Sequence, residues 1–270
     1  MSELSDRNIT VAFPVVDDFL WRAGRDGHAV KSPVTLSVGE LVGPLFELAA
    51  ARRVNNNAFS GISFNGDIAA RICESLERRS IWGDHYGARS GVFPLYARNA
   101  SAIGNSLWDH WRSRLQQAAE GVGFPKIFAQ GLVGAVGELV SNVDEHSGDM
   151  HYGFVAFHST GGSFEVVVSD SGVGVLKTLR RSAAYAEVGD SGAAMRLALT
   201  ERVSSLSAPN RGYGYRPLFL TIAGHAGLAR FRTGDHSLTI SGDNLSLQGI
   251  VETAQRAALP GLTISVLCRL

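Results

Sequence analysis

The segment 131–148, GLVGAVGELVSNVDEHSG, constrains the fold of this chain more than any other. Its apolar residues recur at the spacing of an amphipathic helix: Leu132, Val133, Val136, Leu139, Val140 and Val143. Glu138, Asn142 and His146 stand at successive four-residue steps, and at about 3.6 residues per turn they share the other face. Polar groups beside a core cost free energy unless a partner satisfies them. The segment therefore predicts that a ligand, a metal ion or a tertiary contact meets these three side chains.

Length and composition narrow the class of protein. The chain has 270 residues, which suggests two domains of ordinary size or one large one. Its 25 basic and 25 acidic residues balance, so we expect neither a nucleic acid nor an anionic membrane as partner. Cys73 and Cys268 stand far apart, which argues against a disulfide framework or a structural zinc site. Without a signal segment or a run of about 18 apolar residues, we expect a soluble cytoplasmic protein.

Strands alternate with helices along the first hundred residues. We expect strands at 9–16, 33–38, 58–64 and 91–96, a helix at 39–53, and a second helix carrying Ile68, Ile72 and Leu76. Such βαβ units predict a small α/β domain with a regulatory or partner-binding role, faintly similar to the STAS-type modules that accompany signalling ATPases. A helix at 100–119 then joins the halves. We place the domains at 1–105 and 126–270, with a connecting helix and linker at 106–125.

The second half predicts a hairpin, short helices and terminal strands. We expect hairpin strands at 151–158 and 163–169, helices at 176–183, 193–203 and 217–226, and strands at 227–233, 236–241 and 261–269, the last two separated by a poorly patterned loop.

The second informative feature is Asp170-Ser-Gly-Val-Gly174, directly after the strand at 163–169. A carboxylate at a strand end can accept a hydrogen bond from an exocyclic amino group such as adenine N6. Gly172 and Gly174 lack a Cβ, so the backbone can approach a base or a phosphate closely. Taken alone, the pattern is also that of an ordinary strand-to-helix turn.

The third feature is Arg211-Gly-Tyr-Gly-Tyr-Arg216, a glycine-rich loop before a helix. Its backbone N–H groups and the positive end of the helix can hold phosphate oxygens, and Arg211 or Arg216 can add charge-assisted hydrogen bonds. A loop of this kind, on its own, is more often only a loop.

In this order and spacing, the three features resemble the ATP-binding domain of the GHKL superfamily, which includes histidine kinases, anti-sigma-factor serine kinases and type II topoisomerases. The resemblance covers roughly residues 125–270 and ends in a PGxTxxV strand. It is closest to stand-alone bacterial signalling ATPases of the histidine kinase or anti-sigma kinase type. It implies an α+β two-layer sandwich, the Bergerat-type fold, with ATP and Mg²⁺ as ligands.

The resemblance gives each polar residue of the helix a role. Asn142 would coordinate Mg²⁺, because an amide oxygen suits a hard cation. Glu138 would orient or deprotonate the attacking water or hydroxyl. His146 is open between a contact to a phosphate and an ordinary surface hydrogen bond. Without the other features, Glu138 would be interpreted as one member of an ion pair with a lysine or arginine. Asn142 would be interpreted as a side chain that caps or bridges backbone groups.

The same resemblance assigns the two glycine-containing segments. Asp170 would bind adenine N6, with Gly172 and Gly174 shaping the base pocket. Gly212 and Gly214 would close around the phosphates. The reaction implied is in-line phosphoryl transfer, helped by positioning and by neutralisation of charge.

Two departures from the family pattern concern the phosphate site. Tyr215 follows Gly214 with no third glycine, and a leucine separates Gly261 from Thr263. His110 lacks the acidic and proline residues of a phospho-acceptor histidine, so an enzyme that acts on a partner is favoured over an autokinase.

These features predict a signalling protein that binds ATP and a protein partner. The first hypothesis is an ATPase or protein kinase that phosphorylates a partner's Ser or His. The alternative is an interaction module that ATP switches with little or no turnover, and the altered glycine loop leaves a third, a purely scaffolding domain. Glu138 favours turnover, because a module that only binds nucleotide needs no base.

Overall fold

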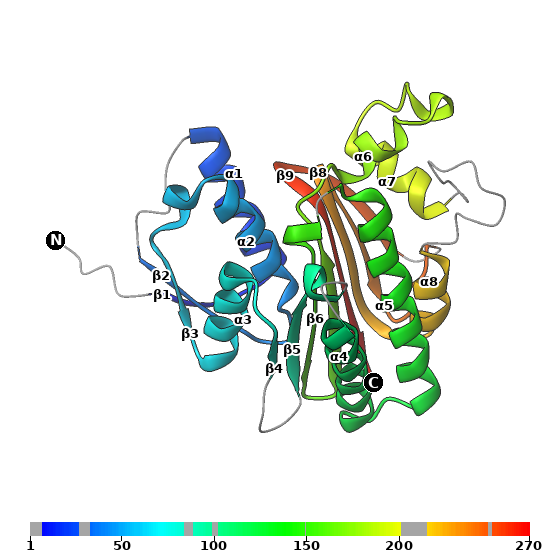
Figure 1. Cartoon of the computed structure of the whole chain (residues 1–270). Coiled ribbons are helices and arrows are strands. Elements are labelled where there is room, and N and C mark those ends of the chain that lie inside the picture. Colours follow the sequence, from blue (N-terminus) through cyan, green and yellow to red (C-terminus); the bar gives the residue numbers. More distant parts are fainter. Residues whose placement is uncertain are drawn as a thin grey trace.

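The computed structural model describes residues 7–26, 33–83, 89–98, 102–148, 150–200, 215–247 and 250–270. Two β-sheets, with helices between and around them, make up this part of the chain (Figure 1). The smaller sheet has the strand order β1-β2-β3 and the larger one the order β4-β5-β6-β7-β9-β8. The prediction of a mixed α/β protein with a sheet flanked by helices is confirmed.

The small sheet consists of parallel strands joined by helices. Its elements are β1 (Arg7–Thr10), α1 (Phe13–Asp26), β2 (Val34–Ser37), α2 (Gly43–Val54), η1 (Asn56–Phe59), β3 (Ile62–Asn65) and α3 (Asp67–Arg78). The predicted strand at 9–16 is wrong beyond Thr10, because α1 begins at Phe13. Pro14 falls in the first turn of α1, where a backbone N–H has no partner within the helix and its loss costs little.

The large sheet is antiparallel throughout its described pairs. Its strands are β4 (Trp82–Gly83), β5 (Ser90–Pro94), β6 (Phe154–Thr160), β7 (Ser163–Ser169), β8 (Ala226–Gly242) and β9 (Ile250–Arg269). Because β5 pairs with β6, residues 82–83 and 90–94 of the predicted N-terminal domain lie in the same sheet as the predicted ATP-binding domain.

The two terminal strands are longer than the sequence predicts. The expected strands at 227–233 and 236–241 form the single strand β8, with a bulge around Gly234. The loop expected before residue 261 is wrong over 250–260, where β9 pairs with the outer half of β8. Most residues of 250–257 are exposed or half-buried, so their hydrophobic alternation is weak.

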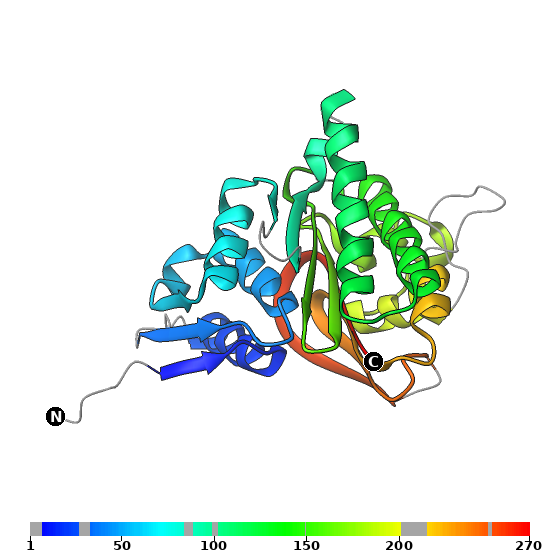
Figure 2. The ribbon, with the colours of Figure 1, turned by 90° about the horizontal axis from the view of Figure 1, so that it is seen from below.

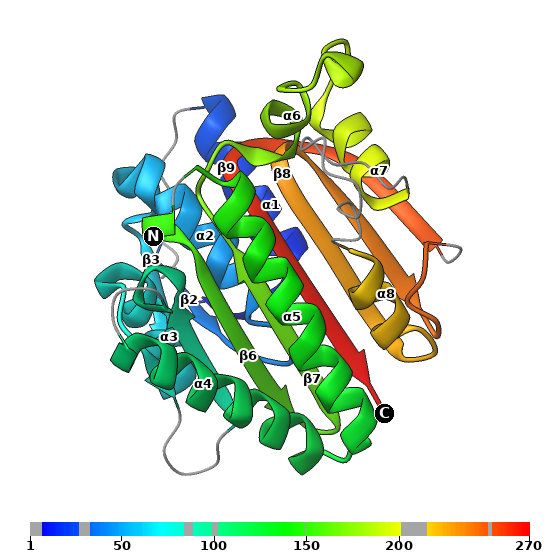
Figure 3. The same ribbon diagram turned by 45° about the vertical axis from the view of Figure 1, so that its right-hand side comes forward.

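Helices cover one face of the large sheet. They are α4 (Ala102–Gly121), α5 (Lys126–His146), α6 (Gly174–Leu179), α7 (Ser191–Thr200) and α8 (Arg216–Ile222), with short turns η2 (Leu95–Arg98), η3 (Met150–Tyr152) and η4 (Ala183–Tyr185). Figure 3 shows α5 lying along β6, β7 and β9, with α8 beside it. The apolar side of α5, including Leu132, Val136 and Val140, is buried in one core with Val155 and Val166 of the sheet.

Helices α1, α2 and α3 cover the other face. Seen from below, they and the small sheet lie on the opposite side of the large sheet from α4 and α5 (Figure 2). Phe154 and Ala156 of β6 and Val167 of β7 share a core with Phe46 of α2 and Ile72 of α3. The two parts of the chain are therefore joined by a common hydrophobic core. None of the described helices has the length and apolar character that crossing a membrane requires.

Candidate functional site

The three predicted polar residues of α5 lie on the side of the helix toward α8. Gly131 marks this side, since a Cβ there would lie 3.1 Å from Thr221 Oγ1 of α8. Glu138, Asn142 and His146 follow Gly131 by 7, 11 and 15 residues, which at about 3.6 residues per turn puts all three within about 60° of it around the helix. Glu138 is exposed, while Asn142 and His146 are half-buried.

Glu138 and Asn142 make no polar side-chain contact with the described part of the chain. Among the residues that the structure describes, no group forms a hydrogen bond or ion pair with either side chain. The ion pair and the backbone cap considered for them from sequence are thus not formed there. A carboxylate and an amide on one helix side remain available to a ligand.

Asp170 lies at the end of β7 and is 4% exposed. Its Oδ1 accepts a 2.7 Å hydrogen bond from the backbone N–H of Gly172, and its own N–H donates to Leu262 O at 2.9 Å. These bonds hold the carboxylate in one orientation at the edge of the turn. A carboxylate has about four acceptor positions, so it can accept from Gly172 and from more than one further donor.

The Asp170 turn packs directly on the C-terminal end of α5. The N–H of Val173 donates a 2.9 Å hydrogen bond to Ser147 O. Thr178 of α6 donates to His146 O at 3.4 Å. The structure thus brings the last turn of α5 and the Asp170 turn together, although His146 and Asp170 are 24 positions apart in the sequence.

Close packing explains why both positions 172 and 174 of the turn are glycine. A Cβ on Gly172 would lie 2.0 Å from Ser147 O. Gly174 has a φ of 77°, and a Cβ there would lie 2.8 Å from Thr233 Oγ1. Their absent side chains allow α5, α6 and β8 to meet closely. In the structure, the backbone at these glycines closely approaches other atoms of the protein, Ser147 O and Thr233 Oγ1.

Thr233 of β8 is a site residue that the sequence did not single out. It is buried, and its hydroxyl donates to Gly261 O at 2.7 Å and accepts from Val175 N at 3.2 Å. It therefore ties the start of α6 to both terminal strands. The only signal in the sequence is a threonine beside Gly234 in an apolar strand, which is too common to indicate this role.

Tyr215 connects α8 with the Asp170 turn. Its half-buried ring meets the ring of Phe231 edge-on, with centroids 5.8 Å apart. Burial raises the pKa of its phenol, and the negative charge of Asp170 raises it further. The start of α8 therefore lies within electrostatic reach of Asp170. The predicted phosphate-binding residues Arg211, Gly212 and Gly214 lie outside the described residues.

The side-chain oxygens at this site fit a magnesium ion whose other ligands are phosphate and water oxygens. Within the described ranges, no three His, Cys, Asp or Glu side chains converge as a metal site would require. Mg²⁺ is often bound through only one or two protein oxygens, with phosphates and water completing its shell. Asn142, half-buried and without a partner in the described part of the chain, can supply one such oxygen.

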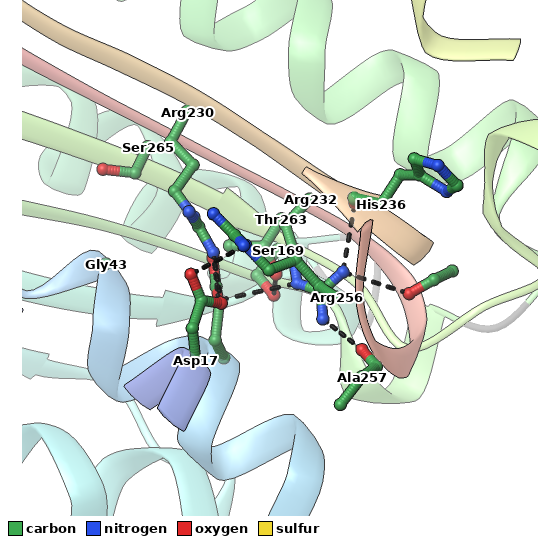
Figure 4. Close-up of polar contacts among 12 residues, drawn as sticks. Asp17, Gly43, Ser169, Arg230, Arg232, His236, Arg256, Ala257, Thr263 and Ser265 are labelled. Carbon is green, nitrogen blue, oxygen red and sulfur yellow. Dashed lines mark hydrogen bonds and ion pairs between the residues drawn. The ribbon is translucent and has the colours of Figure 1, made fainter. Parts of the chain in front are cut away.

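A buried ion network lies behind the site, on the opposite face of β8 (Figure 4). Arg230 forms a bidentate pair with Glu47 of α2, at 2.8 and 3.1 Å, and donates to Asp17 of α1 at 2.7 Å. Arg256 of β9 lies 3.0 Å from the other oxygen of Asp17. These contacts fasten α1 and α2 to the terminal strands.

Arg232, two residues along the same face, is only 1% exposed. It donates to the carbonyl oxygens of Gly234 and His236, at 3.2 and 3.1 Å, and to that of Ala257. Burial lowers its pKa to about 10 in spite of the nearby Glu47. Since side chains alternate along a strand, Arg232 supports the bulge from one face while Thr233 holds the Asp170 turn from the other.

The chain matches no protein-family model, no curated protein and no solved structure. Its function can therefore be inferred only from the residues that α5 and the Asp170 turn bring together. These are the buried carboxylate of Asp170 at the end of α5 and, about one and two turns earlier on that helix, the half-buried amide of Asn142 and the exposed carboxylate of Glu138.

Proposed function

We propose that residues 126–270 form a Bergerat-type domain that binds Mg-ATP, and that this chain is a signalling ATPase or protein kinase acting on a partner protein. The observation that carries the proposal is the contact between the C-terminal end of α5 and the turn that holds the buried carboxylate of Asp170. This contact joins the two sequence features to which the family resemblance assigns metal and base recognition.

Each residue has a role that its environment supports. Asp170, held by Gly172 N and buried at the strand end, would accept a hydrogen bond from the adenine amino group. Asn142 would hold Mg²⁺, which neutralises phosphate charge when bound. Glu138, exposed to water and to a partner's hydroxyl, would take up the proton released by the attacking group.

The surrounding residues complete the proposed site. Arg211, Gly212 and Gly214 would surround the phosphates, as the glycine-rich sequence before α8 predicts. His146, half-buried on the same side of α5 as Asn142, would donate to a phosphate oxygen. Tyr215 would close the side of the pocket next to Phe231.

A second candidate is an interaction module that ATP switches with little turnover. It is favoured by the contact between Arg53 of α2 and Ser171 of the turn, at 2.7 Å. Through this contact, a change in the turn would reach the N-terminal α/β unit directly. That unit, which we propose to be STAS-like, would then present a different surface to its partner.

Calorimetric titration of the full chain with ATP, with and without Mg²⁺, tests nucleotide binding. Asp170→Asn is the informative variant, because an asparagine can still accept from Gly172 N but places an amino group or a weaker acceptor toward adenine. We expect the wild type to bind in a Mg-dependent way and the variant to bind at least about tenfold more weakly. Asp243→Asn, at an exposed position, is the matched control and should bind as wild type. Equal affinities of wild type and Asp170→Asn, or no binding by either, would contradict the proposal.

A further inference from the structure

A pocket lies between α2, α3 and η3, on the face of the large sheet opposite α5. Its volume is about 380 Å³. Binding sites for small organic molecules typically occupy about 300–1,000 Å³, so this pocket has room for a small one. No sequence pattern indicates this pocket, since its walls come from separate segments. We propose that it binds a small organic anion with an apolar body.

The walls of this pocket are mainly apolar. Leu45 and Leu48 of α2 and Leu76 of α3 line it, together with Phe64 of β3 and Ala49. The three leucines are almost fully buried and form a fixed base, and the half-buried Ala49 and Phe64 provide the apolar surface that is open to a ligand. An alkyl chain or a flat ring placed against these side chains would leave water, which is favourable in proportion to the apolar area covered.

Two arginines at the pocket determine the charge of its ligand. Arg52 and Arg53 both line it, and among the described residues of its lining Glu77 is the one carboxylate. The contact between Glu77 and Arg52 is 3.8 Å long, and the Glu77 side chain is 67% exposed. A long contact to an exposed carboxylate neutralises an arginine poorly. The lining therefore carries an excess of positive charge, and an anion fits it.

Arg52 is held in place with donor capacity left over. Its guanidinium lies 5.0 Å from the centroid of the Phe64 ring and donates to Ile62 O at 2.9 Å. Its Nε is buried and has no hydrogen-bond partner among the described residues. Its Nη1 has, among the described residues, only the 3.8 Å contact with the exposed carboxylate of Glu77, so this end of the guanidinium can donate to an anion. This arginine therefore gives the pocket a preorganised anion contact.

Arg53 connects the pocket with the proposed nucleotide site. Its guanidinium lies over the ring of Tyr152, at 5.2 Å, and donates to Ser171. Ser171 stands between Asp170 and Gly172. An anion that draws Arg53 toward the pocket would weaken its bond to Ser171. Any effect of this weaker bond on the binding of ATP rests on the proposed function, whereas binding of the anion does not.

Binding is tested with octanoate and octanol, which share an alkyl chain and differ in charge. Each is titrated calorimetrically into the full chain without nucleotide, so the result is independent of ATP binding. We expect octanoate to bind at least about tenfold more tightly than octanol, as one charge-assisted hydrogen bond would provide. Equal affinity for the two compounds, or no binding of octanoate, would overturn the proposal.

Two variants locate the bound octanoate. Ala49→Phe fills the pocket from a half-buried position, and Arg53→Gln removes one cation; we expect each to weaken octanoate binding at least about tenfold. Arg71→Gln is the control, since Arg71 is exposed on α3 and pairs with Glu74. Thermal melting verifies that each variant is folded. Unchanged octanoate affinity in both pocket variants would place the compound elsewhere and refute the proposed site.

Discussion

The Glu165 carboxylate, in the middle of β7, accepts a 3.0 Å hydrogen bond from the backbone N–H of Gly43, the first residue of α2. The N–H of Val42 and the hydroxyl of Ser265 also donate to it. Glu165 is 0% exposed, and burial raises its pKa to about 7 although these three bonds oppose the rise. A titratable group thus lies between the large sheet and the N-terminal helices.

The raised pKa of Glu165 predicts a pH-dependent stability. Between its ordinary value of 4.5 and about 7, the folded state holds a proton that the unfolded state has released. The contribution of this group to the free energy of unfolding is therefore full below pH 4.5 and is lost as the pH rises through about 7. The predicted loss is on the order of 3 kcal/mol.

Glu165→Gln isolates this contribution, because glutamine does not titrate. We expect the free energy of unfolding of the wild type, relative to that of the variant, to fall between about pH 5 and about pH 8. Denaturant unfolding at both pH values measures it. Glu252→Gln, at an exposed position of β9, should show no such trend. A difference between wild type and Glu165→Gln that stays constant with pH would contradict the assignment.

The buried pair of Arg230 and Glu47 predicts a large loss of stability when one partner is removed. Their side chains are 4% and 0% exposed, so Glu47→Gln would remove the bidentate anion of a buried guanidinium and leave it only Asp17. We expect a loss of about 3–5 kcal/mol in the free energy of unfolding by denaturant titration. Glu40→Gln breaks the pair with Arg269, which is almost half exposed, and should cost at most about 1 kcal/mol. Similar costs for the two variants would show that the buried network contributes little.

The Asp170 turn predicts a strict requirement for glycine at position 172. An alanine there would place its Cβ 2.0 Å from Ser147 O, a backbone atom that cannot turn away. We expect Gly172→Ala to lower the free energy of unfolding by about 1–3 kcal/mol or more, measured by denaturant titration. Gly189→Ala is the control, because a Cβ there meets no atom within 4 Å. Its effect should stay within about 0.5 kcal/mol, and equal effects at both positions would disprove the close packing of the turn.

The sequence predicts those parts of the fold that short-range patterns determine. The apolar spacing of 131–148 indicates α5, and the sequence before Asp170 indicates a strand and a turn, which the structure confirms. The placement of Asp170 next to the end of α5 follows from a family resemblance and not from any local pattern. Local periodicity says which side of an element is buried, but not what it is buried against.

The contacts between distant segments are the part that the sequence did not predict. Glu47 and Arg230 are 183 residues apart, and Arg53 and Ser171 are 118 apart. A charged residue in a strand or helix pattern is normally read as exposed, so nothing identifies these pairs in advance. One signal was available: the run Val166 to Val168 lacks alternation, which is typical of a strand covered on both faces.

The environments of Glu138 and Asn142 predict different effects on binding and turnover. Glu138 is exposed and has no partner in the described part of the chain, so Glu138→Gln should leave Mg-ATP affinity within about threefold of wild type. If Glu138 is the base, phosphate release or partner labelling should fall by about 10²–10⁴-fold. Asn142→Ala should instead remove the Mg²⁺ dependence of ATP binding in calorimetry, because it deletes the proposed metal oxygen. Unchanged turnover in Glu138→Gln would exclude it as the base, and Mg-dependent ATP binding without turnover in the wild type would favour the ATP-switched interaction module.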